Sequence, residues 1–150
     1  MIQEFHAHTM HETVAAAVQL TGNGSAVNVS NAQDITIIAE INKGSADTIT
    51  LTPQRDDAAG AAWGAIVNNA KIFVAADTGT SSTWVRATDN TAYTSGAVNT
   101  THRVMMKIDP DSLGLHTTDL PAVQIRVVIS GGHADDRGSV TCYITPRYKP

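Results

Sequence analysis

Three histidines and a glutamate stand close together near the start of the chain. His6, His8 and His11 are followed directly by Glu12, and imidazole and carboxylate groups are common ligands of zinc and related metals. A strand would place His6 and His8 on one face and His11 on the other, whereas a helix would align His8 with His11 but not with His6. The spacing therefore favours a polar N-terminal arm over a metal site.

Serine and cysteine could act as nucleophiles, but neither has the surroundings that this chemistry requires. The chain has no Gly-x-Ser-x-Gly motif, and Ser25 follows Gly22, Asn23 and Gly24, which predict a hairpin turn. Cys142 is the single cysteine, and no sequence feature marks it as a thiol of low pKa. We expect it to be a small buried hydrophobic residue. The sequence thus predicts no enzymatic activity and no cofactor.

Pairs of aspartates could offer oxygen ligands to Ca²⁺ at residues 56–57, 109–111 and 135–136. None of these pairs has the regular spacing of a known calcium loop. We therefore interpret them as solvated turns.

The two tryptophans, Trp63 and Trp84, could stack on sugar rings as in carbohydrate-binding modules. Aromatic residues of this size more often anchor the core of a β-sandwich. We expect Trp63 to belong to a core strand, and glycan stacking by Trp63 or Trp84 stays as an alternative.

Charged residues are scarce. Asp, Glu, Lys and Arg make up 16% of the chain, against about 25% in typical globular proteins. The formal net charge is -4 and the basic residues are scattered, so the basic face that nucleic-acid binding requires is missing. A neutral surface of short side chains suits extensive contact with other proteins, as in an assembly subunit.

The chain starts without the basic and apolar segments of a secretory signal, and no apolar run approaches the ~20 residues that span a bilayer. We therefore expect a protein that is made and folded in a cytoplasm and has no membrane partner.

The elements that would position these residues are short β-branched runs separated by turn residues. We expect nine strands, at residues 26–29, 34–41, 47–52, 62–67, 71–75, 83–87, 102–108, 123–129 and 139–145, and one helical turn at 109–113. This density predicts a single all-β domain, an antiparallel β-sandwich or jelly roll over residues 21–150. Residues 1–20 show no clean strand and are either an extended N-terminal arm or a first strand.

Two of these runs alternate clearly. In residues 48–52, Ile49 and Leu51 share one face and the threonines share the other. In residues 124–129, Ile125, Val127 and Ile129 should point inward while Arg126 points outward. Both patterns are typical of half-buried antiparallel strands.

The pair His6 and His8 followed by Glu12 is similar to the first metal motif of cupins, a jelly-roll family. This resemblance would make all three residues metal ligands. The chain departs from the cupin pattern, because Gly131, Gly132 and His133 lack the companion residues of the second motif.

The order of several stretches resembles small virion proteins of tailed phages, many of them capsid decoration or cement subunits. The stretches are DITIIAEI at residues 34–41, GSADTITLT at 44–52, AW at 62–63, IDPDSL at 108–113, IRV at 125–127 and YITPRY at 143–148. The resemblance implies a β-sandwich that binds the major capsid protein on the outer surface of the head, as a trimer or dimer, with no catalytic residues.

We expect the apolar residues Ile2, Phe5 and Met10 of the arm to make assembly contacts, by adding a strand to a neighbouring sheet or filling a groove. The alternatives are another virion structural protein, such as a tail-tube, head-completion or baseplate subunit, or a carbohydrate-binding β-sandwich module.

Overall fold

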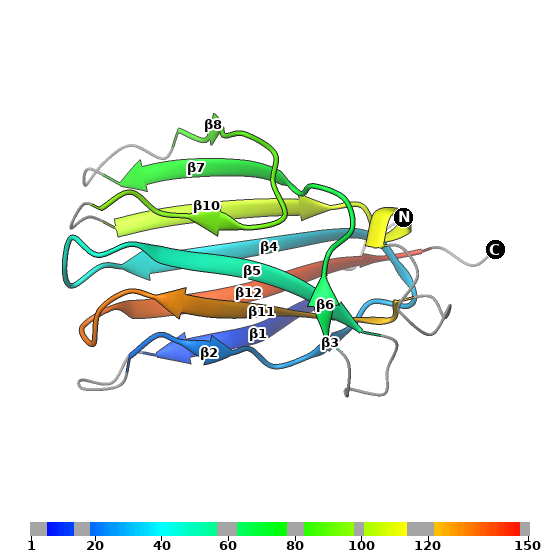
Figure 1. Cartoon of the computed structure of the whole chain (residues 1–150). Coiled ribbons are helices and arrows are strands. Elements are labelled where there is room, and N and C mark those ends of the chain that lie inside the picture. Colours follow the sequence, from blue (N-terminus) through cyan, green and yellow to red (C-terminus); the bar gives the residue numbers. More distant parts are fainter. Residues whose placement is uncertain are drawn as a thin grey trace.

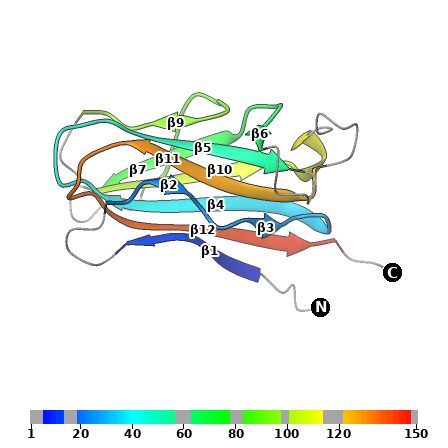
Figure 2. The same ribbon diagram turned by 60° about the horizontal axis from the view of Figure 1, so that its bottom comes forward.

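The chain folds into two antiparallel β-sheets packed face to face (Figures 1 and 2). The computed structural model describes residues 6–13, 19–56, 63–77, 83–97, 101–113 and 122–147. The expected all-β sandwich is confirmed. Within the described residues, no helical segment is long and apolar enough to cross a lipid bilayer.

The first sheet, sheet A, contains the longest strands of the molecule. Its strand order is β1 (His6–Thr13), β12 (Arg137–Pro146), β4 (Ala32–Asn42), β10 (Thr101–Ile108), β7 (Lys71–Asp77) and β8 (Val85–Arg86). The central strand β4 pairs with both β12 and β10 along its length. β1 and β8 form the two edges of sheet A.

The second sheet, sheet B, is built on the pair β5 and β11. The strands are β11 (Gln124–Gly131), β5 (Ile49–Asp56), β2 (Gly22–Asn23), β3 (Val27–Asn28), β6 (Gly64–Ala65) and β9 (Tyr93–Thr94). β2 and β3 pair with β11, while β6 and β9 pair with β5. Two long strands therefore carry sheet B, and short strands extend it on both sides.

The core lies between the two sheets and consists of alternate residues from each long strand. Ile49, Leu51, Ile125, Val127 and Ile129 are buried from sheet B, as the alternation predicted. Sheet A contributes Ile35, Ile37, Ala39, Ile41, Val104, Met106, Ile108, Val140 and Cys142. Because the side chains between these positions point away from the core, each sheet also has an outer face.

All nine expected strands are present, although β3, β6 and β8 are only two residues long. The expected helical turn is the 3-10 helix Pro110–Leu113. The predicted turn at residues 22–24 was wrong in part, because Gly22 and Asn23 pair with β11 as the short strand β2. β9 was not anticipated.

Of the two expectations for the N-terminal segment, the first strand is present at residues 6–13, which form β1 and pair with β12. β1 contains a β-bulge between Thr9 and His11, and the backbone N–H of Ser25 donates to the carbonyl of Met10 at 2.9 Å. The side chain of Met10 is buried in the core and only 4% exposed. The start of the chain is therefore an integral edge strand over these residues.

Candidate functional site

The bulge in β1 changes how the histidines are arranged. His6, His8 and His11 each lie opposite a buried residue of β12, and residues that are paired directly across two strands point to the same side of the sheet. The bulge adds one residue at Met10 and so cancels the odd spacing between His8 and His11. The prediction that His11 faces away from His6 and His8 was therefore wrong.

The shared face does not bring the imidazoles into one site. His11 is buried, and its Nε2 donates to the carbonyl oxygen of Val127 in β11 at 2.8 Å, whereas His6 and His8 are exposed. A carbonyl oxygen can only accept, so Nε2 of His11 carries the proton. This residue serves as a tie between the two sheets at their edge.

Glu12 lies opposite Ser139 and points to the other side of sheet A from His6 and His8. The ligand set that the cupin resemblance implied is therefore not assembled. Among the described residues, no group of three or more His, Cys, Asp and Glu side chains lies close enough to hold a metal ion.

Cys142 is fully buried in the core, as expected. Burial raises the pKa of its thiol to about 12, because the apolar surroundings disfavour the thiolate. The thiol stays protonated and unreactive at neutral pH.

The acidic pairs hold loops together. Asp136 is fully buried, which corrects the expectation of a solvated turn. Its carboxylate accepts hydrogen bonds from the backbone N–H groups of Gly44 at 2.8 Å and His133 at 2.9 Å. Asp109 accepts from the N–H of Asp111 at 3.0 Å. Asp56 is also fully buried, at the end of β5, so it is not in a solvated turn either. Asp57 lies outside the described residues.

A buried lysine is the group that sequence reasoning missed. Lys43 is only 6% exposed, and its ammonium group donates to the carbonyl of Asp47, to the carbonyl of Gly96 at 2.9 Å and to Ser95 Oγ at 3.4 Å. A serine beside a lysine can form a catalytic pair. Here all three donors of the ammonium are used, so Lys43 holds two loops together.

The tryptophans are both partly exposed, and Trp63 precedes β6, so the expectation that it belongs to a core strand was wrong. The guanidinium carbon of Arg126 lies 4.3 Å from the ring centre of Trp63, and Arg126 also donates to Gln54 Oε1 at 2.8 and 3.0 Å. One face of the Trp63 ring is therefore covered by a cation–π contact within the chain. A sugar could not stack on that face without displacing Arg126.

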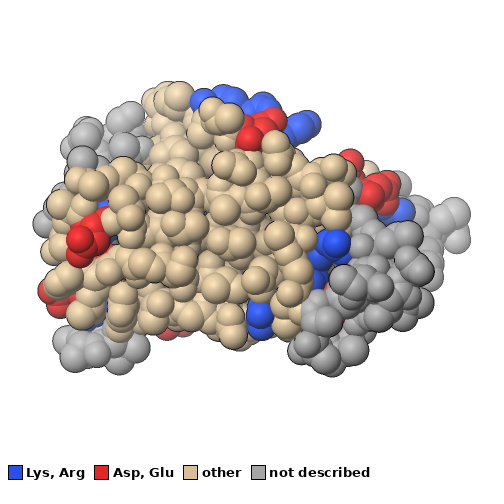
Figure 3. Space-filling view, viewed as in Figure 1, with Lys and Arg blue, Asp and Glu red and all other residues tan. Residues whose placement is uncertain are grey.

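The outer face of sheet B has a broad area without charge (Figure 3). It combines small hydroxyl and amide side chains with one valine: Asn23, Thr50, Thr52, Thr94, Val128 and Ser130. Thr50 and Thr94 share a hydrogen bond of 2.9 Å between their hydroxyls. We call these six residues the uncharged face.

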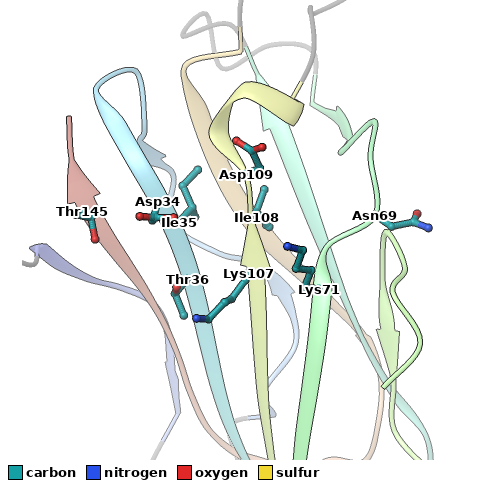
Figure 4. A pocket seen from close by; sticks show the side chains of 9 residues that line it. All are labelled: Asp34, Ile35, Thr36, Asn69, Lys71, Lys107, Ile108, Asp109 and Thr145. Carbon is teal, nitrogen blue, oxygen red and sulfur yellow. The ribbon is translucent and has the colours of Figure 1, made fainter. Parts of the chain in front are cut away.

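The outer face of sheet A is different, because it carries charged side chains beside uncharged ones such as Ile38 and Met105. Arg103 on β10 donates to Glu40 on β4 at 3.1 Å. Towards one end of the sheet, Lys71 and Lys107 line a hollow of about 450 Å³ (Figure 4). We call this face the charged face.

The fold has a counterpart among solved structures. It is similar to the crystal structure of the SPBc2 prophage-derived protein YomS, with a TM-score of 0.58 and 12% sequence identity over 96% of this chain and 95% of that chain. No family model and no curated protein sequence matches the chain. The likeness establishes a shared fold along nearly the whole of both chains.

Proposed function

We propose that this chain is a structural subunit of a tailed-phage virion, and specifically a capsid decoration protein that binds the outer surface of the head and stabilises the shell. The uncharged face of sheet B is the observation that carries the proposal. It would dock on the major capsid protein, and the subunit would have neither catalytic activity nor a cofactor. The fold that the chain shares with a prophage-derived protein supports the phage setting.

The uncharged face suits such a contact for a physical reason. Burying a charge without a partner is costly, whereas hydroxyl and amide groups can exchange hydrogen bonds with water for hydrogen bonds with a partner. The side chains of Thr50, Thr52 and Ser130 are short, so little rotamer entropy is lost when they are ordered. A rigid sheet beneath them holds the surface in shape before it binds.

Stabilisation of the shell would follow from mass action. A subunit that binds only the assembled, expanded shell lowers the free energy of that state and of no other. If each subunit is a dimer or trimer of this chain, its contacts with several capsid subunits add through multivalency. Individually weak contacts can then give full occupancy.

The N-terminal segment contributes less to this proposal than the sequence indicated. Met10 packs into the protein's own core, so its side chain is not available for an assembly contact. Ile2 and Phe5 lie outside the described residues, and their assembly role stays a prediction.

The test is a binding experiment with phage heads that carry no decoration protein. The wild-type chain should sediment with expanded heads at a fixed copy number and should not sediment with procapsids. Val128→Lys and Thr52→Lys, which place a cation on the uncharged face, should reduce occupancy by about a hundredfold. Thr141→Lys is the matched control, because Thr141 lies on the charged face, and it should bind like the wild type.

Failure of the wild type to bind any head would overturn the decoration role. Binding to tail tubes or baseplates would favour another virion position. A melting temperature that rises with soluble neutral glycans would favour a carbohydrate-binding module. Equal losses for Thr141→Lys and Val128→Lys would overturn the assignment of the binding surface.

A further inference from the structure

Two lysines on the charged face stand directly opposite each other. Lys71 on β7 and Lys107 on β10 are paired in register, both side chains are exposed, and neither forms an ion pair with any described residue. Like charges placed directly across two strands repel each other. An anion that lies near both ammonium groups would relieve this repulsion.

The lysines belong to a hollow of about 450 Å³ that also contains carboxylates and hydroxyls. Asp34 lies on β4 and Asp109 follows the end of β10. In Figure 4 the ammonium of Lys107 is directed toward Thr36, while Asp109 lies beside the 3-10 helix. The hollow therefore offers a cationic region and, next to it, a region of hydrogen-bond acceptors.

We propose that this hollow binds a small acidic sugar. The carboxylate or phosphate of the sugar is held by Lys71 and Lys107 through charge-assisted hydrogen bonds. Its neutral hydroxyl groups donate to the carboxylates of Asp34 and Asp109. The volume lies within the range of small-molecule sites, about 300 to 1,000 Å³.

Simpler ligands make favourable contacts with only some of the groups that line the hollow. A bare anion meets the lysines but is repelled by Asp34 and Asp109, and a cation meets the carboxylates but is repelled by the lysines. A neutral sugar offers the two lysines no anionic acceptor. A zwitterionic amino acid matches both charges but leaves unused the neutral hydroxyls of Thr36 and Thr145, which also line the hollow.

This site is independent of the proposed function. It lies on the outer face of sheet A, whereas the proposed capsid contact lies on the outer face of sheet B, so both surfaces can be occupied at once. Sugar binding can be measured on the free protein, without any virus particle.

The experiment is an NMR titration of the isotope-labelled protein at low salt with D-glucuronate. D-glucose, inorganic phosphate and L-glutamate serve as the neutral, bare-anion and zwitterion comparisons. Glucuronate should shift the amide signals of residues 34–36, 71 and 107–109, and it should bind at least tenfold more tightly than the three comparison compounds. Lys107→Gln and Lys71→Gln should each weaken glucuronate binding about tenfold, because each removes one charge-assisted hydrogen bond.

Arg103→Gln is the control, since it removes one cation from the same face but outside the hollow; it should leave glucuronate affinity within twofold. Asp34→Ala tests both effects of this carboxylate, which accepts a hydrogen bond from the sugar and repels a bare anion. It should weaken glucuronate binding and strengthen phosphate binding. Glucuronate affinity that rises in Asp34→Ala, equal binding of glutamate or phosphate, or signals that do not shift would overturn the proposal.

Discussion

The two outer faces of the sandwich are built by the same strand alternation and yet carry different chemistry. Along β5 and β11 the face of sheet B carries hydroxyl, amide and aliphatic side chains, and the guanidinium of Arg126 lies beside them, bonded to Gln54. The face of sheet A carries the Arg103–Glu40 pair and the hollow with Lys71 and Lys107. The inward side chains of both sheets are mostly apolar, with His11 and His102 among the buried exceptions.

The two sets of positions have different roles: the inward residues stabilise the fold, and the outward residues form the surface. An inward position must be apolar and of the right volume, because the interior is close-packed. An outward position on a half-exposed sheet is much less constrained by stability. The contrast between the two faces is therefore less constrained by folding than the inward positions are.

The largest predicted effect compares neighbouring residues of β11. Ile129→Ala should lower the free energy of unfolding by about 2 to 5 kcal/mol, because it opens a cavity between the sheets. Val128→Ala, on the uncharged face, should lower it by less than about 1 kcal/mol. Urea denaturation measures both changes. Equal losses would mean that the uncharged face contributes to folding rather than being kept for contact.

The second prediction concerns the hydrogen bond between His11 in β1 and Val127 in β11, which joins the two sheets at one edge. A Cβ atom at Gly24 would lie 2.7 Å from His11 Nε2 and 2.8 Å from the carbonyl oxygen of Val127. Gly24→Ala should therefore destabilise the fold by about 1 to 3 kcal/mol. Gly64→Ala is the control, because a Cβ there meets no atom within 4 Å. If both variants have the melting temperature of the wild type, the contact between His11 and Val127 does not contribute to stability as predicted.

The third prediction concerns the pH dependence of stability that arises from His102, which is buried on the inner side of sheet A. Burial, and secondarily the charge of Lys43, holds the pKa of His102 below its ordinary value of 6.5. The unfolded chain thus binds a proton more readily than the folded chain, and stability is lost as the pH falls below about 6.5. The slope from this residue cannot exceed about 1.4 kcal/mol per pH unit.

Denaturation of the wild type and of His102→Gln between pH 7.5 and 5 isolates this contribution. The wild type should lose more stability on acidification than the variant does. A wild type whose stability falls no more steeply than that of His102→Gln would refute the assignment.

The smallest predicted effect tests the lysine pair. Lys71→Thr removes one of two opposed cations and should raise the free energy of unfolding by about 0.2 to 1 kcal/mol. The gain should shrink at 1 M salt, where charges are screened beyond about 3 Å. Differential scanning calorimetry at two salt concentrations would show this. A loss of stability at low salt would indicate that Lys71 already has a stabilising partner.

Much of the fold could be predicted because alternation is a local signal. Ile49 and Leu51, and the residues Ile125, Val127 and Ile129, are buried as their spacing required. The arrangement of His11 could not be predicted, because a single bulged residue reverses the parity of a strand and leaves no mark in the hydrophobic pattern.

The candidate surfaces were harder to foresee than the strands. Low charge content indicated a contact surface somewhere, but the pairing of β5 with β11 decided that the uncharged residues gather on one face. The opposition of Lys71 and Lys107 depends on the register of strands that are separated by more than twenty residues of sequence. Such register is set by tertiary packing and not by local composition.

The most direct test of the account is a cryo-electron-microscopy reconstruction of expanded heads with the purified protein bound. We predict a subunit seated with β5 and β11 toward the shell, with the uncharged face buried against the major capsid protein and the hollow of sheet A turned away from it. A subunit that meets the shell through Lys71, Lys107 and the rest of the charged face would contradict it, as would heads that carry no bound protein.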